Sequence, residues 1–117
     1  GQQADKMLQV TDINTSAHQR HIVLFGDNEI DLTFRFIPIT EEWFFNVEYN
    51  GVKLNGVRMA VGALHCNSQL FPFDFWISDT TGQGVDPFLL EDFYTGRCEF
   101  NILERAEMEL LRGFSVD

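Results

Sequence analysis

The stretch that decides the fold is residues 31–59, DLTFRFIPITEEWFFNVEYNGVKLNGVRM. From Ile30 to Phe36 apolar residues occupy every second position, and polar residues fill the positions between them. Successive side chains of a strand point to opposite faces, so this period predicts a strand with one buried and one solvated face. Pro38 cannot donate a ladder hydrogen bond, which predicts that pairing stops near it or that it lies at a sheet edge.

A turn signal at residues 40–42 separates this strand from a second alternating segment, residues 43–49. Asn50-Gly51 follows, and a two-residue type I′ turn needs positive φ at both central positions, which Asn and Gly tolerate. A second Asn-Gly pair at residues 55–56 is too close to the first for another hairpin, so we expect a β-bulge within a third strand. The decisive stretch therefore predicts a three-stranded antiparallel meander.

The rest of the chain extends this meander into one small domain. The patterns predict further strands at residues 21–25, 73–78 and 98–103, and a helix at residues 86–93 with Asp86 as its N-cap. The expected fold is mainly β: a small antiparallel sheet or a partly closed barrel, with that short helix and a helical C-terminal tail.

We divide the chain into an N-terminal arm, residues 1–20, a β domain, residues 21–103, and a tail, residues 104–117. The arm has no clean period of either kind, and we expect it to be disordered alone or ordered by a partner. Part of it, around residues 7–10, is a candidate extra strand.

The length and net charge of the chain restrict the classes of function that it can have. The 117 residues are enough for one domain with its own core. Eight Lys plus Arg against eighteen Asp plus Glu give a formal charge of -10, which repels nucleic-acid phosphates and anionic lipids. No apolar run approaches the roughly 20 residues of a spanning helix, and the N-terminus lacks a signal-peptide pattern. We therefore expect a protein that is intracellular or assembled from the cytosol, with no specific nucleic-acid or membrane partner.

The cysteines and histidines do not have the spacing of a metal site. His65-Cys66 and Cys98 offer ligand atoms, but no C-x-x-C or H-x-x-x-H pattern accompanies them. We expect Cys66 and Cys98 to be reduced, buried small side chains, and a disulfide between them is the alternative.

Catalytic signals are equally weak. The adjacent acids Glu41-Glu42 and Glu91-Asp92 are candidates for a general acid and base, yet no nucleophile is placed beside them. Phosphate-binding glycine loops and the G-x-S-x-G motif do not occur. The sequence predicts a protein that is not an enzyme and binds no cofactor and no metal.

The aromatic content is high, with twelve Phe, two Trp and two Tyr. Several strands carry large apolar residues on both faces. The neighbours Trp43 and Phe44 point to opposite faces of one strand, and Phe75 and Trp76 do the same in another. A second apolar face must be covered either by other parts of the chain or by other subunits. The candidate partner surface consists of Ile37, Ile39, Phe44, Trp76, Met7, Leu8, Val10, Leu110 and Leu111. We also expect open sheet edges near Pro38 and along residues 98–103.

Residues 22–103 contain LTFRF, EWFFNVEYNGVKLNGVRMAVG and PFDFWISDTTGQGVDPFLLEDF in succession. This succession resembles the small baseplate plug family of contractile-tailed bacteriophages, including cyanophages. The matching points are Trp43 at the start of a strand, the bulged strand with Gly56, Val57, Met59 and Gly62, the acidic turn at Asp79, and Asp86-Pro87. The arm to residue 20 and the tail from residue 104 lie outside the resemblance.

The resemblance implies a virion component: a plug-like structural subunit at the junction of the hub and the tail tube, assembled in the host cytoplasm. Its implied partners are other baseplate, hub and tail-tube subunits, and copies of itself in a ring. An alternative from the residues alone is a small β-barrel that binds an apolar ligand inside, with Phe71, Phe75 and Trp76 as pocket walls. A third is an acidic hydrolase that uses the adjacent acids above.

Overall fold

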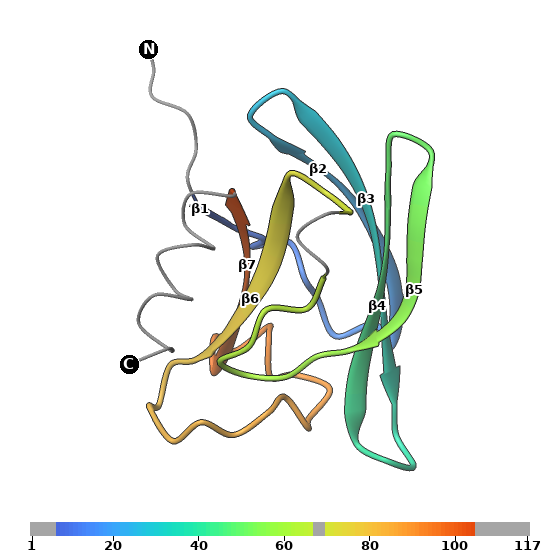
Figure 1. The fold of residues 1–117 in the computed structure, drawn as a ribbon. Coiled ribbons are helices and arrows are strands. Elements are labelled where there is room, and N and C mark those ends of the chain that lie inside the picture. Colours follow the sequence, from blue (N-terminus) through green and yellow to red (C-terminus); the bar gives the residue numbers. More distant parts are fainter. Residues whose placement is uncertain (1–6, 67–69, 105–117) are drawn as a thin grey trace.

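The computed structural model describes residues 7–66 and 70–104. They form seven strands and no helix, arranged in two antiparallel sheets that face each other (Figure 1). The strands are β1 (Met7–Gln9), β2 (His18–Phe25), β3 (Asn28–Ile37), β4 (Glu42–Tyr49), β5 (Val52–Arg58), β6 (Phe73–Asp79) and β7 (Cys98–Glu104).

The four-stranded sheet has the order β2-β3-β4-β5, so the chain runs through it as a simple meander. The predicted type I′ turn is confirmed, since φ is 54° at Asn50 and 81° at Gly51. The predicted bulge is confirmed as well: the register of β4 and β5 shifts between Phe45 and Val47, and Gly56 in β5 has a φ of 69°. The bulge adds one residue to β5 and keeps its apolar side chains on the inner face.

The three-stranded sheet has the order β1-β7-β6. The candidate strand in the arm is confirmed as β1, which pairs with β7 from Met7↔Leu103 to Gln9↔Asn101. The predicted open edge along residues 98–103 is wrong, because β7 has a partner strand on each side. Alternation alone predicted that this segment is a strand, but it carries no signal for a pairing with residues almost a whole chain length away.

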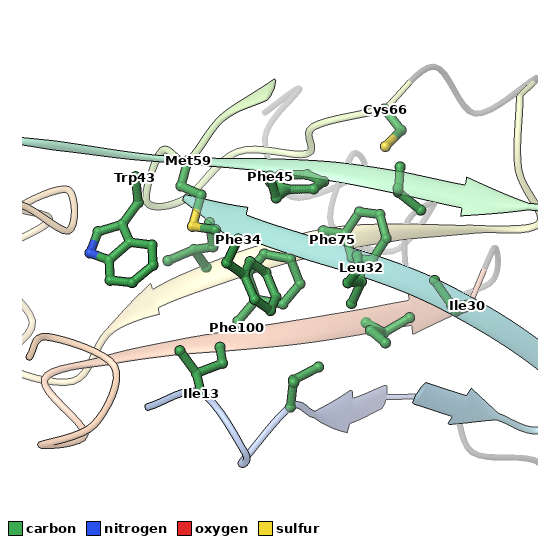
Figure 2. Packing of buried hydrophobic residues seen from close by; sticks show 14 of the residues in the cluster. Ile13, Ile30, Leu32, Phe34, Trp43, Phe45, Met59, Cys66, Phe75 and Phe100 are labelled. Carbon is green, nitrogen blue, oxygen red and sulfur yellow. The ribbon is translucent and has the colours of Figure 1, made fainter. Parts of the chain in front are cut away.

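Phenylalanine rings from both sheets fill the space between them (Figure 2). The ring of Phe100 on β7 lies 4.9 Å from that of Phe34 on β3 and 5.3 Å from that of Phe45 on β4. It also lies 5.3 Å from Phe75 on β6, so one side chain contacts three strands. Offset and edge-to-face packing of this kind adds to the stabilisation from buried apolar area.

The sheets do not close into a barrel. The mainly β antiparallel prediction is confirmed, but β1 pairs with β7 and not with β2, so each sheet keeps its own edges. Phe71 and Phe75, the candidate pocket walls of the alternative ligand-binding hypothesis, are 1% and 0% exposed and belong to the packed core.

The predicted helix at residues 86–93 is wrong, because this segment forms an extended stretch followed by turns. The Asp86 carboxylate does not cap the segment; it accepts a hydrogen bond from the Val61 amide at 2.8 Å and one from Arg58 at 3.1 Å. The Asp92 carboxylate accepts the amide hydrogens of Phe88 and Leu89, so the donors of this segment are satisfied by a side chain.

The other expected boundaries fall as follows. The first strand of the meander sheet begins at His18, so β1 and the start of β2 both belong to residues assigned to the arm. Val10 and Ile13 from the same stretch are buried in the core. The expected helical tail, with Leu110 and Leu111, lies outside the described residues.

Substituting Phe100 by alanine should lower the free energy of unfolding by about 3–5 kcal/mol, because it empties a site that three strands share. Urea denaturation of the purified chain measures this change. Ile39→Ala is the matched control: Ile39 is 94% exposed, and its loss should change stability by no more than about 0.5 kcal/mol. Equal effects of the two substitutions would contradict the described core.

Candidate functional site

The side of the four-stranded sheet that points away from the core is the candidate functional site, and we call it the outer face. Cross-strand pairs place His18 opposite Arg35, Thr33 opposite Asn46, and Phe44 opposite Arg58. The outer face comprises His18, Arg20, Ile22, Leu24, Glu29, Asp31, Thr33, Arg35, Ile37, Glu42, Phe44, Asn46, Glu48, Lys53 and Arg58.

One end of the outer face is hollowed. The hollow has a volume of about 400 Å³. It is lined by Thr33, Arg35, Ile37, Thr40, Glu42, Phe44, Asn46 and Gly56, and we call it the apolar hollow. Phe44 and Ile37 supply its apolar wall, and the bulge in β5 brings Gly56, which has no side chain, to its floor. Asn46 accepts a hydrogen bond from the Gly56 amide at 2.7 Å, which fixes this floor.

Arg35 is the exposed cation of the apolar hollow. Its side chain makes no hydrogen bond and no ion pair within residues 7–66 and 70–104. By contrast, Arg58 beside it contacts Asp86 at 3.1 Å and Glu42 at 3.9 Å. A guanidinium next to an aromatic ring and an aliphatic side chain is suited to a partner that offers both an apolar group and a carboxylate.

The middle of the outer face carries a row of charges. Arg20 donates two hydrogen bonds to Asp31, at 2.9 and 2.7 Å. The hydrogen bond from Arg20 lowers the pKa of Asp31 below its ordinary value. Glu48 stands opposite Asp31, and Lys53 stands opposite Glu48, so two adjacent carboxylates in the middle of the row have a cation on each side, Arg20 on β2 and Lys53 on β5.

Two further hollows lie next to the apolar hollow on the outer face and share lining residues with it or with each other. A hollow of about 210 Å³ shares Thr33 and Asn46 with the apolar hollow. A third, of about 610 Å³, shares Arg20, Asp31 and Glu48 with the second and reaches Gly51. Together they form a continuous groove along β3 and β4, apolar at the end near Thr40 and charged toward the other.

The structure brings together only some of the residues of the predicted partner surface. Ile37 and Phe44 line the same hollow, and Ile39 lies in the turn just beyond it, fully in solvent. Trp76 is half-buried on the other sheet, Met7 is 58% exposed and Leu8 is packed against the core. Val10 is only 6% exposed, so it belongs to the core and not to the surface.

The sequence search missed the polar part of the groove. Arg35, Thr33 and Asn46 lie on the same strand faces as Ile37 and Phe44, and alternation already placed them there. The available signal was therefore the shared strand face, whereas the choice of apolar residues alone found only Ile37 and Phe44 among the eight residues that line the apolar hollow.

A second cluster of charges holds the connection between β6 and β7. Arg97 donates hydrogen bonds to both carboxylate oxygens of Asp92, at 3.0 and 2.9 Å, and lies 3.4 Å from Asp79. Hydrogen bonds from the Thr81 hydroxyl and the amides of Val85 and Thr81, together with Arg97, lower the pKa of Asp79 to about 2. Burial opposes ionisation of Asp92, but Arg97 and two amides lower its pKa overall. These acids stabilise the loop and are not poised for proton transfer.

A buried carboxyl lies beside the segment that leads into β6. Asp74 is 0% exposed, and its Oδ1 accepts the amide hydrogens of His65, Cys66 and Phe75. Its Oδ2 has no hydrogen-bond partner within the described residues. Burial raises the pKa of Asp74, and the three amides offset this only in part.

The cysteines are both buried and free of disulfides, as expected. Burial raises the pKa of both thiols, that of Cys98 to about 12. The His65 ring accepts the Ala60 amide hydrogen at Nε2 and lies 3.0 Å from the Phe75 carbonyl at Nδ1, so both its nitrogens serve the fold. Within the described ranges, no three or more metal-type ligands gather, and no helix could cross a membrane.

Replacing Arg97 by glutamine should lower the free energy of unfolding by about 2–3 kcal/mol, because the buried Asp92 carboxylate loses its charge partner. Arg58→Gln is the control, since Arg58 is exposed and its ion pairs should contribute about 0–1 kcal/mol. Thermal and urea denaturation of both variants provide the comparison, and a larger loss for Arg58→Gln would contradict this assignment.

Asp74→Asn should change how stability depends on pH. The folded pKa of Asp74 is raised, so its favourable contribution is complete below the unfolded pKa of about 3.9 and is lost as pH rises through the folded value. The asparagine Oδ1 still accepts the three amides and carries no charge. Relative to the wild type, the variant should therefore gain stability between pH 4 and 7 in urea denaturation.

Asp27→Asn, in an exposed turn, is the control for that experiment and should leave the pH dependence unchanged. If Asp74→Asn follows the wild-type curve at every pH, the buried carboxyl does not affect stability in this way.

Comparison with known proteins adds no family to this description. A scan against protein-family models finds no match, and a search of curated proteins finds no significant similarity.

Proposed function

We propose that this chain is a non-enzymatic structural subunit of a bacteriophage tail baseplate, a plug-like component at the hub and tail-tube junction. Its partners would be baseplate, hub and tail-tube subunits, and its location the virion. Two independent arguments support this role: the resemblance carried by residues 22–103, and a surface suited to docking.

The residues that carry the resemblance have structural tasks in this fold. Trp43 donates its indole hydrogen to the Leu89 carbonyl at 3.0 Å, which ties β4 to the loop before β7. Gly56 allows the bulge, Asp79 binds its own loop, and Asp86 joins that loop to Val61. The resemblance therefore concerns the scaffold, whereas docking depends on the exposed surface.

The observation that carries the proposal is the apolar hollow with Arg35, which has no hydrogen-bond or ion-pair partner among the described residues. Phe44 and Ile37 are only partly covered by the chain itself, and Ile39 is 94% exposed beside them. Apolar groups at the centre with charged groups around them are typical of protein interfaces. A neighbouring subunit that inserts an apolar side chain near an acidic residue would bury Phe44 and pair with Arg35.

The test is co-expression of the full chain with the tail-tube and hub proteins of the same phage genome, followed by size-exclusion chromatography. The wild type should co-elute with at least one of them, whereas Phe44→Glu and Arg35→Glu should elute alone. Tyr94→Glu is the control, because Tyr94 is 69% exposed and belongs to the β6–β7 connection. Co-elution of all variants, or of none including the wild type, would contradict docking through the apolar hollow.

A second candidate function is binding of a small apolar ligand in the same hollow. Its volume of about 400 Å³ lies within the range of small-molecule sites. The candidate differs from the earlier barrel hypothesis, since the site would be on the surface and not between the sheets. Saturable binding of a hydrophobic fluorescent dye that Phe44→Glu abolishes, without co-elution with any tail protein, would favour it.

A further inference from the structure

The three-stranded sheet has a side that points away from the aromatic core, and we call it the second outer face. Phe100 and Ile102 of β7 lie in the core, and successive side chains of a strand point to opposite sides. The residues beside them therefore belong to the second outer face, as do their cross-strand neighbours on β1 and β6. The second outer face comprises Met7, Gln9, Asp74, Trp76, Ser78, Glu99, Asn101 and Leu103.

The centre of the second outer face is deeply buried. Leu103 is 2% exposed, but it does not belong to the hydrophobic cluster between the two sheets. Asn101 on the same strand is 6% exposed, and Trp76 opposite Asn101 is half-buried. Side chains on an uncovered face of an antiparallel sheet are open to solvent. A further layer of protein must therefore lie on this face.

None of the described strands supplies that layer. The four-stranded sheet packs on the opposite side of β6 and β7 (Figure 1). The segment 61–66 runs along the edge of β6, and its amides at His65 and Cys66 bind the Asp74 carboxylate. That segment contributes to the burial of Asp74 on the edge strand, whereas Leu103 lies on the central strand β7.

The pattern of burial indicates where the covering layer lies. Along β7, the side chains on this face become more buried toward its C-terminal end, from Glu99, which is half-buried, through Asn101 to Leu103. Across the sheet, Met7 pairs directly with Leu103 and is nevertheless 58% exposed. The cover therefore lies over the end of β7 and leaves β1 open. The chain leaves β7 at that same end, after Glu104.

We propose that residues 105–117 of the same chain cover the second outer face. This segment begins two residues after Leu103 in the sequence. Its apolar residues are Ala106, Met108, Leu110, Leu111, Phe114 and Val116. Ala106, Leu110 and Phe114 recur at intervals of four, a spacing typical of one face of a helix. Docking of such a face on the sheet buries Leu103 and the exposed part of Trp76 together with the apolar residues of the segment.

The covalent link favours this segment over a second copy or another protein. Residue 105 is bonded to Glu104 at the end of β7, so the segment stays at a high effective concentration over the face. Its own charge is close to balanced, with two arginines against three acidic residues. A second copy would instead bring a formal charge of -10 toward a chain of the same charge.

The predicted partner surface becomes smaller as a result. Leu110, Leu111 and Trp76 are then buried within one chain, and the apolar hollow on the other sheet remains for partners. Covering of the second outer face is independent of the baseplate role, and the chain alone is sufficient to test it.

A nitroxide label attached at Glu109→Cys tests where the segment lies in the full chain. Both native cysteines are buried, so the label reacts at one known position. In NMR spectra, the amide signals of Trp76 and Asn101 should lose intensity relative to the chemically reduced label. The amides of Thr33 and Asn46, on the outer face of the other sheet, should keep theirs. Loss at Thr33 and Asn46, or at none of these amides, would overturn the proposal.

A mixed sample separates the segment of the same chain from that of a second copy. Nitroxide-bearing chains without isotope are mixed with isotope-labelled chains that carry no nitroxide. The amides of Trp76 and Asn101 should keep their intensity in this mixture. Loss of intensity there would identify a second copy's segment as the cover and would also overturn the proposal.

Leu110→Glu provides a second measurement without a label. Trp43 is 0% exposed, so an increase in the quenching of tryptophan fluorescence by acrylamide reports Trp76. Leu110→Glu should increase this quenching, because a buried carboxylate weakens docking of the segment. Ile39→Glu, at a 94% exposed position, is the matched control and should quench as the wild type does. Circular dichroism checks that both variants remain folded, and equal quenching of Leu110→Glu and the wild type would contradict a cover over Trp76.

Discussion

Contact between the aromatic rings of the two sheets is the interaction on which the rest of this structure depends. Phe100 lies between Phe34, Phe45 and Phe75, and the backbone hydrogen bonds of each sheet do not cross this layer. Each sheet presents its apolar side chains to the other, and neither sheet has a second layer of described helices to cover it. No described strand packs on the outer face of the four-stranded sheet, although Phe44 and Ile37 lie on it.

Local signals in the sequence were sufficient for most of the four-stranded sheet. Alternation, the Asn50-Gly51 turn and the bulge at Gly56 each depend on residues close together in the chain, and all were predicted correctly. The helix at residues 86–93 failed because its signals were also local, while the carboxylate of Asp86 binds a partner 25 residues away. The division into two sheets was missed for a related reason, since periodicity identifies strands but not the strand with which each one pairs.

The residues of the candidate site could also be predicted only in part from the sequence. Alternation placed Ile37 and Phe44 on a face that the meander does not bury, which is where the apolar hollow lies. Val10 and Leu8 were also predicted to contact a partner, because the arm shows no clean period of its own, but the pairing of β1 with β7 turns them toward the core. Tertiary pairing decides whether an apolar residue contacts a partner or belongs to a core. The sequence of one strand does not show which strand it pairs with.

The pairing of β1 with β7 determines when the second sheet can form during synthesis on the ribosome. Met7 and Leu103 are neighbours in one sheet, although nearly the whole chain separates them. The meander can form while synthesis continues, because its turns are short, but the second sheet must wait for its central strand to emerge. Until then the inner surface of the meander, with Phe34 and Phe45, has nothing to cover it. The nascent chain would therefore expose this hydrophobic surface until β7 has been synthesised.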